Sequence, residues 1–111
     1  MTSVSLRRND LRTARTSLCE SVRLSTETRG ATYRNTLIAR LNLVGLSRQM
    51  GLIGAGRKQL DLVTKDIDTI ALPPTDPLRG AIHLHTALLA IANREYDEAL
   101  RAVTSAEQFF A

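Results

Sequence analysis

The chain has 111 residues, 43% of them apolar and 23% charged, and this composition is typical of one globular domain. Its formal net charge of +4 divides into a basic N-terminal part and an acidic C-terminal part. No segment approaches the roughly 20 apolar residues that span a bilayer, and the first residues lack the apolar core of an export signal. The single cysteine excludes an internal disulfide. We therefore expect a cytoplasmic protein without a membrane partner, in which residues 1–111 form a single helical repeat domain.

The first helix is predicted over residues 6–29, after a polar and flexible lead-in of residues 1–5. Apolar residues recur there at spacings of three and four, which is the period of an amphipathic helix. These residues are Leu11, Ala14, Leu18 and Val22. Gly30 then offers the left-handed conformation with which helices often end.

A first helix pair is predicted over residues 31–71. Its first helix begins near Ala31 and stops near Gly51, and its second helix begins near Ala55. Successive prolines then break the chain at Pro73-Pro74. Each helix carries one apolar stripe, formed by Tyr33, Leu37, Leu41 and Val44 in the first and by Leu60, Val63, Ile67 and Ile70 in the second.

A second helix pair is predicted over residues 77–110. Pro77 suits the first turn of a helix, and Asp76 or Thr75 precedes it as a cap. The helix from Leu78 to Ala92 is apolar on nearly every side, which is typical of a buried helix, and the last helix is amphipathic. Because no segment alternates with period two, we predict an all-α fold of about five antiparallel helices.

The two predicted helix pairs align with each other at an offset of 43 residues. Gly56 and Ala99 fill equivalent places, where a small residue lets two crossing helices approach closely. Larger apolar residues follow one turn later and fill the groove. They align as Leu60 with Val103, and in the next turn Val63 aligns with Ala106.

This pattern resembles the tetratricopeptide repeat, in which a small residue late in the first helix packs against an alanine early in the second. An apolar helix reaching Asn93-Arg94-Glu95 and a second helix beyond it carry the resemblance most clearly. It covers residues 31–110 and implies helix pairs stacked in a short right-handed solenoid that binds other proteins. The chain departs from the family in its period, which is usually about 34 residues. Arg40 and His83 stand where an aromatic residue is usual.

The segment from Leu72-Pro73-Pro74 to Asp97-Glu98-Ala99-Leu100 looks like the C-terminal repeat region of bacterial helix-turn-helix transcriptional regulators. In those regulators a similar helical array senses a peptide or supports dimerisation. The preference for arginine over lysine fits a GC-rich bacterial source. The alternative function is therefore a peptide-binding sensor domain of a transcriptional regulator, without its own DNA-reading segment before residue 31.

The principal functional prediction is a non-enzymatic protein-protein interaction or dimerisation module. In a solenoid the first helix of each pair forms the inner surface, where Arg48 would hold a carboxylate of a bound peptide. The predicted partner-binding residues are Ile38, Leu41, Arg48, Gln49, Leu84, Leu88, Ile91 and Ala92. Because the sequence closes with Phe109-Phe110-Ala111 rather than with a polar capping helix, we also predict a homodimer. Its predicted interface residues are Leu89, Val103, Phe109 and Phe110.

Two further patterns, a pair of glycines and a pair of histidines, suggest ligand sites but lack the surroundings that such sites need. Gly54 and Gly56 suggest a dinucleotide-binding loop, but no βαβ pattern surrounds them. His83 and His85 are two residues apart, so on a helix they point to nearly opposite sides and cannot share a metal ion. We find no catalytic constellation and expect no metal and no cofactor.

Nucleic acid is a minor alternative partner, which would bind only through the basic N-terminal helix. A helix at the N-terminus would present a strip of arginines to phosphate groups. The strip consists of Arg8, Arg12 and Arg15.

Overall fold

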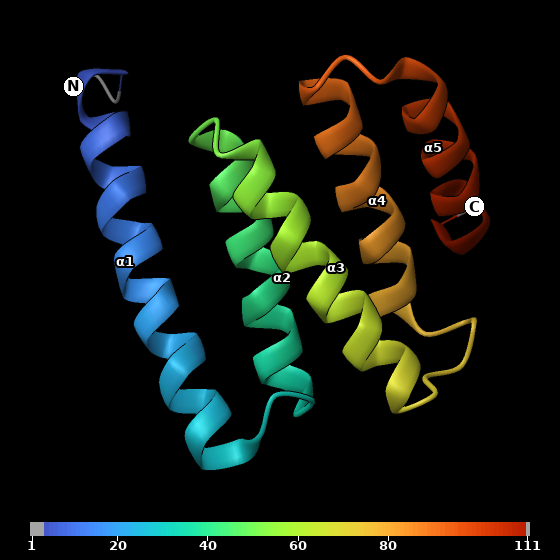
Figure 1. Ribbon diagram of the computed structural model, residues 1–111, viewed down its shortest axis with the longest axis horizontal. Coiled ribbons are helices and arrows are strands. Elements are labelled where there is room, and N and C mark those ends of the chain that lie inside the picture. The colour runs from blue at the N-terminus through green and yellow to red at the C-terminus, as the bar shows by residue number, and fades with distance from the viewer. Residues whose placement is uncertain (1–3, 111) are drawn as a thin grey trace.

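The computed structural model describes residues 4–110, with the backbone alone for residues 4–9, 96, 109 and 110, and shows five α-helices (Figure 1). Each helix runs in the opposite direction to the one before it, and the described range contains no strand. The helices are α1 (Val4–Arg29), α2 (Arg34–Gln49), α3 (Ile53–Thr69), α4 (Pro77–Ala92) and α5 (Tyr96–Phe110). The predicted all-α fold with five helices is confirmed.

The helix starts differ from the prediction by a few residues. α1 begins at Val4, so the last two residues of the expected flexible lead-in are helical, while residues 1–3 lie outside the described residues. α2 begins at Arg34, three residues after the predicted start, because the chain must first reverse its direction after α1. Gly30 makes this reversal with a φ of +100°, and Tyr33 precedes α2 in an extended conformation.

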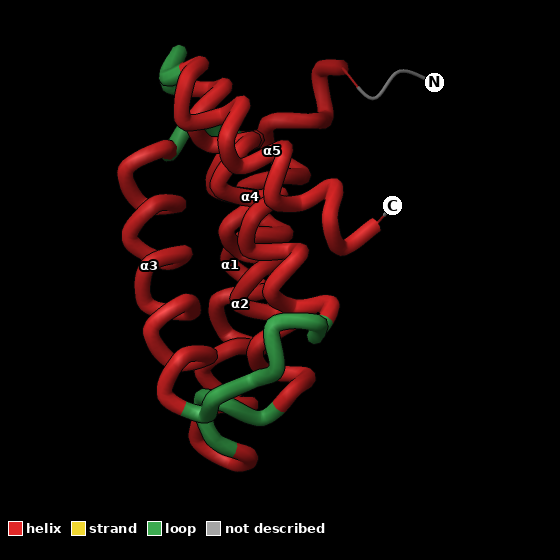
Figure 2. The backbone as a smooth tube through the Cα atoms, turned by 90° about the vertical axis from the view of Figure 1, so that its right-hand side faces the viewer, coloured by secondary structure: helices red, strands yellow, loops and turns green. Residues whose placement is uncertain are grey.

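The helices pack in the order of the sequence, with α4 at the centre of the arrangement. Among the described residues, α1 packs against α2 and α5 packs against α4, whereas α4 contacts α2, α3 and α5. α3 lies across α2 and α4 in a second layer (Figures 1 and 2). The apolar core fills the space between α2, α3 and α4. It consists of Leu37, Leu41, Val44, Leu60, Val63, Ile67, Leu78, Ile82 and Leu89.

The two helix pairs, α2–α3 and α4–α5, repeat each other in space as well as in sequence. Three of the four equivalent helix bounds are 43 residues apart, namely Arg34 and Pro77, Gln49 and Ala92, and Ile53 and Tyr96. The turn inside each pair also has the same conformation. Gly51 has a φ of +78°, and Arg94, 43 residues later, has a φ of +61°.

The hydrogen bonds of the two turns match as well. In each, the amide two residues after the helix cap donates to a carbonyl in the last turn of the helix, which is the Schellman arrangement. The bonds are Leu52 N to Ser47 O at 2.8 Å and Glu95 N to Ala90 O at 2.7 Å. A left-handed conformation is unfavourable for arginine. The packing of the helix pair therefore imposes this turn at Arg94.

Gly56 lies where α3 crosses both α2 and α4. A Cβ atom at this position would lie 3.1 Å from Leu89 Cδ2 and 3.6 Å from the backbone oxygen of Val44. The side chain of Leu89 on α4 and the backbone of Val44 on α2 thus both approach α3 at Gly56. Ala99, the equivalent residue of α5, is likewise buried.

We expect Gly56→Val to lower the free energy of unfolding by about 1–3 kcal/mol, because the added methyl groups would overlap Leu89 and the α2 backbone. Gly54 supplies the matched control, since a Cβ atom there would meet nothing within 4 Å. Gly54→Val should change the free energy of unfolding by no more than about 0.5 kcal/mol. Urea unfolding followed by circular dichroism measures both, and equal effects would contradict the close helix approach at Gly56.

Candidate functional site

A row of partly exposed apolar side chains runs along α4 and α5. Leu84 and Ile91 on α4 are 44% and 48% exposed, and Leu100 and Val103 on α5 are 68% and 37% exposed. Leu88 lies between the two α4 residues and is half-buried. We refer to these five residues as the end face. They carry no charge, so any favourable contact they make must come from burial of apolar surface.

The end face lies on the side of α4 and α5 that points away from α3. On α4, Leu89 packs against Gly56 of α3, and the two exposed end-face residues lie about 140–160° around the helix from Leu89. On α5, Glu98 points toward α3, because its carboxylate lies 3.5 Å from Arg57 Nη1. The end-face residues of α5 lie about 140–160° around the helix from Glu98. The two helices therefore present their end-face residues on one common side.

This face has a counterpart in the first helix pair, and the counterpart is covered. The positions 43 residues earlier are Leu41, Gly45, Arg48, Arg57 and Leu60. Leu41 and Leu60 are only 3% and 5% exposed. Gly45 lies against the ring of His85 of α4, whose Cε1 would be 3.3 Å from a Cβ atom on Gly45. The face of α2–α3 that is equivalent to the end face is thus covered by α4, whereas the end face of α4–α5 is exposed.

The structure gathers only part of the predicted partner-binding set. The three end-face residues of α4 all belong to that set, and Ala92 is exposed at the end of the same helix. Ile38 and Gln49 are exposed on α2, apart from the end face. Leu41 requires a correction. It is a core residue because α4 packs on that side of α2, and it offers a partner no side-chain surface.

The predicted dimer interface needs a similar revision. Leu89 is 1% exposed and packs against Gly56, so it belongs to the core and is not available to a second chain. Val103 does lie on the end face, while the side chains of Phe109 and Phe110 lie outside the described part of the structure. Leu100 was missing from the prediction. One signal in the sequence could have identified Leu100 as an exposed apolar residue. The equivalent residue of α3, 43 positions earlier, is the charged Arg57.

The crossing of α2 and α4 holds two buried nitrogen atoms without hydrogen-bond partners, Arg48 Nε and His85 Nδ1. Burial of the imidazole, followed by the positive charge of Arg48, lowers the pKa of His85 below its ordinary value. His85 is therefore held in its neutral form next to a permanent cation. The sequence predicted Arg48 as a contact residue but gave no sign of its pairing with His85.

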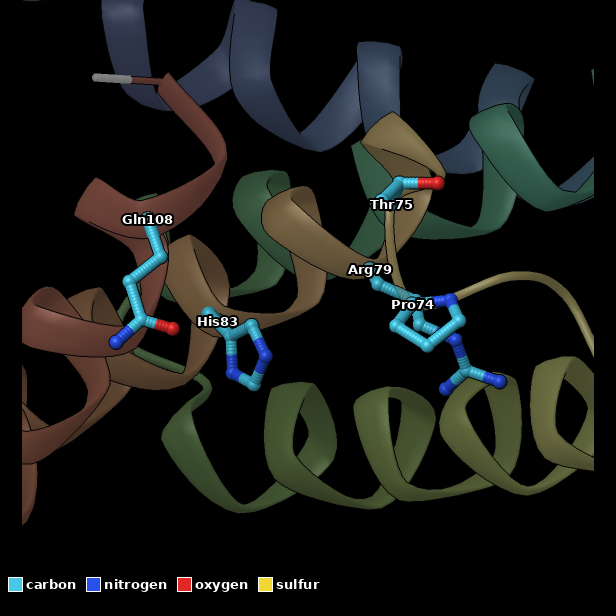
Figure 3. A pocket seen from close by; sticks show the side chains of 5 residues that line it. All are labelled: Pro74, Thr75, Arg79, His83 and Gln108. Carbon is cyan, nitrogen blue, oxygen red and sulfur yellow. The ribbon is translucent and has the colours of Figure 1, made fainter.

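A separate cavity of about 460 Å³ opens between α4, the end of α5 and the connector before α4. Figure 3 shows His83 and Gln108 on one side of it and Pro74, Thr75 and Arg79 on the other. Arg79 donates to Asp68 at 2.8 Å and to the Leu72 carbonyl oxygen at 2.9 Å. Because the arginine is engaged in these bonds, the cavity has no unpaired cation that would select an anionic ligand.

The predicted arginine strip of α1 is only partly available. Arg15 donates its Nε–H to Ser47 Oγ at 3.4 Å and so contacts α2, whereas Arg12 is exposed. The side chain of Arg8 lies outside the described residues. Within residues 4–110, no three histidine, cysteine or acidic side chains come together as a metal site. None of the helices in this range combines the length and apolar character needed to cross a bilayer.

We expect the free energy of unfolding to fall as the pH is lowered through about 6.5, the ordinary pKa of histidine. The unfolded chain then binds a proton on His85 that the native state still excludes, because the native pKa is lowered. The loss continues until native His85 is also protonated. Urea unfolding at a series of pH values measures it. His85→Gln should flatten the profile in this window, whereas His83→Gln, its matched control, should retain it.

Comparisons of this chain with protein-family models, with curated proteins and with solved structures found no match. The interpretation of the end face and of the α2–α4 crossing therefore depends on the residues and geometry described above.

Proposed function

We propose that this chain is a non-enzymatic protein-interaction module that forms a homodimer through its end face, within the cytoplasm. The observation that supports this most directly is the open state of the end face, whose counterpart on the first helix pair is covered by α4. Contiguous exposed apolar residues of this kind are characteristic of surfaces that bind another protein.

The repeat of 43 residues supports a tetratricopeptide-like architecture for the module. In such arrays, successive helix pairs stack through equivalent faces, and each pair contacts only its neighbours. The order of packing agrees with this principle, because α4 contacts both helices of the pair before it, whereas α5 contacts α4. We interpret α2–α3 and α4–α5 as two successive pairs of a short right-handed solenoid. The end face is then the surface that receives a further helix pair.

A second copy of the chain is the occupant that fits this surface. The side of α4 that covers the equivalent face of α2–α3 is already buried within the chain, so a second copy would contribute its own end face. A two-fold contact places each surface against an identical one, and like charges would then repel. The five end-face residues are uncharged, so two copies can meet without such repulsion.

The dimer is expected to be of modest affinity. Full burial of a leucine, isoleucine or valine side chain contributes about 1.5–3 kcal/mol, so each half-exposed end-face residue contributes roughly 1 kcal/mol. Two copies of the face thus supply about 10 kcal/mol, against an association cost of about 4–15 kcal/mol. Dimerisation should therefore depend strongly on concentration, and a single substitution should weaken it measurably.

We expect Leu84→Glu and Leu100→Glu each to shift the chain from dimer toward monomer, because a two-fold contact would bury two unpaired carboxylates at the interface. Leu62→Glu is the matched control, since Leu62 is 52% exposed on α3, outside the end face. Light scattering on a gel-filtration column, over a series of protein concentrations, measures the average mass.

The wild-type chain and Leu62→Glu should approach the mass of two chains at the same concentration. Circular dichroism spectra should show that all the variants keep their helices. A wild-type chain that remains monomeric throughout the series would refute the homodimer, as would equal weakening by all three substitutions.

A further inference from the structure

We propose that Arg48 and His85 form a binding site for one small oxyanion at the crossing of α2 and α4. The site is distinct from the end face and goes beyond the proposed dimerisation. An oxyanion here means a carboxylate, sulfate or phosphate group, which shares the ability to accept two hydrogen bonds from neighbouring N–H donors.

Two buried nitrogen atoms at this crossing lack hydrogen-bond partners. Arg48 Nε and His85 Nδ1 have no hydrogen-bond acceptor or donor in the described part of the protein. A buried polar group without a partner costs about 1–3 kcal/mol, so native proteins leave few of them. Arg48 Nε always carries a hydrogen, and the imidazole can place one on Nδ1. An oxyanion accepts hydrogen bonds from both.

Arg48 also has no carboxylate counter-ion among the described residues. Four other arginines that link separate elements each pair with a carboxylate, whereas none of the ion pairs among the described residues includes Arg48. These pairs are Arg34 with Asp76, Arg40 with Asp66, Arg57 with Glu98, and Arg79 with Asp68. The cation at the α2–α4 crossing is thus balanced by no acidic side chain there, and a bound anion would supply the missing charge.

The His85 ring is held in place against α2, next to the half-buried Arg48 side chain. Gly45 lets the His85 ring lie directly against α2, since its missing side chain would be 3.3 Å from His85 Cε1. The His85 ring therefore has a fixed position relative to Arg48, which follows Gly45 by three residues on α2. Both side chains remain partly exposed although these two nitrogen atoms are buried, so a shift of the flexible Arg48 side chain would admit a small ion from solvent.

Binding of the oxyanion is expected to be coupled to a proton. Burial and the charge of Arg48 lower the pKa of His85, and Arg48 is the only charged group within the described residues that contributes to this shift. A bound anion would offset both effects and raise the pKa again. By linkage, the apparent affinity for the anion then increases as the pH is lowered through the titration of His85.

The two histidines of the chain allow a direct test by nuclear magnetic resonance. The imidazole resonances of His85 and His83 are followed over a pH series in sodium sulfate, in sodium acetate and in sodium chloride of equal ionic strength. We expect sulfate and acetate to raise the pKa of His85 relative to chloride. The resonances of His83, which lies elsewhere on α4, supply the internal control.

Substitution of Arg48 distinguishes a built site from general screening. Arg48→Gln should lower the apparent affinity for sulfate at least about tenfold, because a charge-assisted hydrogen bond is lost. Arg48→Lys keeps the charge and should retain part of the response, and an unchanged His83 spectrum would show that both variants are folded. The proposal is overturned if chloride acts as sulfate does, if His83 responds equally, or if Arg48→Gln keeps the full response. None of these outcomes bears on dimerisation, which is measured separately.

Discussion

The close approach of three helices at Gly56 is the constraint on which the rest of the structure depends. Without a side chain there, α3 can reach the backbone of α2 while Leu89 of α4 fills the remaining space. This contact fixes which side of α4 points inward. It therefore also fixes the opposite side, which carries the end face, and the intermediate side, which brings His85 to Arg48. One missing Cβ atom thus determines the orientation of both candidate sites.

Small residues also lie at the contact between α4 and α5, but here larger apolar residues of α5 remain exposed. Among the described side chains of α5, the buried ones are Ala99, Ala102 and Ala106, while the larger Leu100 and Val103 are exposed. A helix at the surface of a globular protein usually buries its large apolar side chains and exposes polar ones. Here alanines bring α5 close to α4, and the leucine and valine are left for another contact. This inverted distribution is difficult to explain by the stability of a single chain.

The helices and turns could be predicted because they depend on local sequence. The residues that are buried between helices could not, because their burial depends on which helices pack together. The five helices followed from apolar periodicity and from turn residues such as Gly30 and Gly51. The sequence offset of 43 residues also agrees with the spacing of helix bounds such as Arg34 and Pro77. Leu41 and Leu89 were misassigned because each lies in an apolar stripe that looks the same whether it faces a neighbouring helix or solvent. The electrostatic effect of Arg48 on His85 arises only where two helices distant in sequence cross, so no local pattern reveals it.

The character of α4 connects these observations. Its sequence is apolar on nearly every side, which is typical of a helix surrounded by protein. In the described structure α2, α3 and α5 cover three of its sides, and the fourth, with Leu84, Leu88 and Ile91, remains open. A helix that needed only three neighbours would be expected to carry polar residues on the fourth side, as the outer face of α3 does at Lys58, Asp61 and Lys65. The fourth side of α4 is instead apolar, with Leu84 and Ile91 exposed by 44% and 48%.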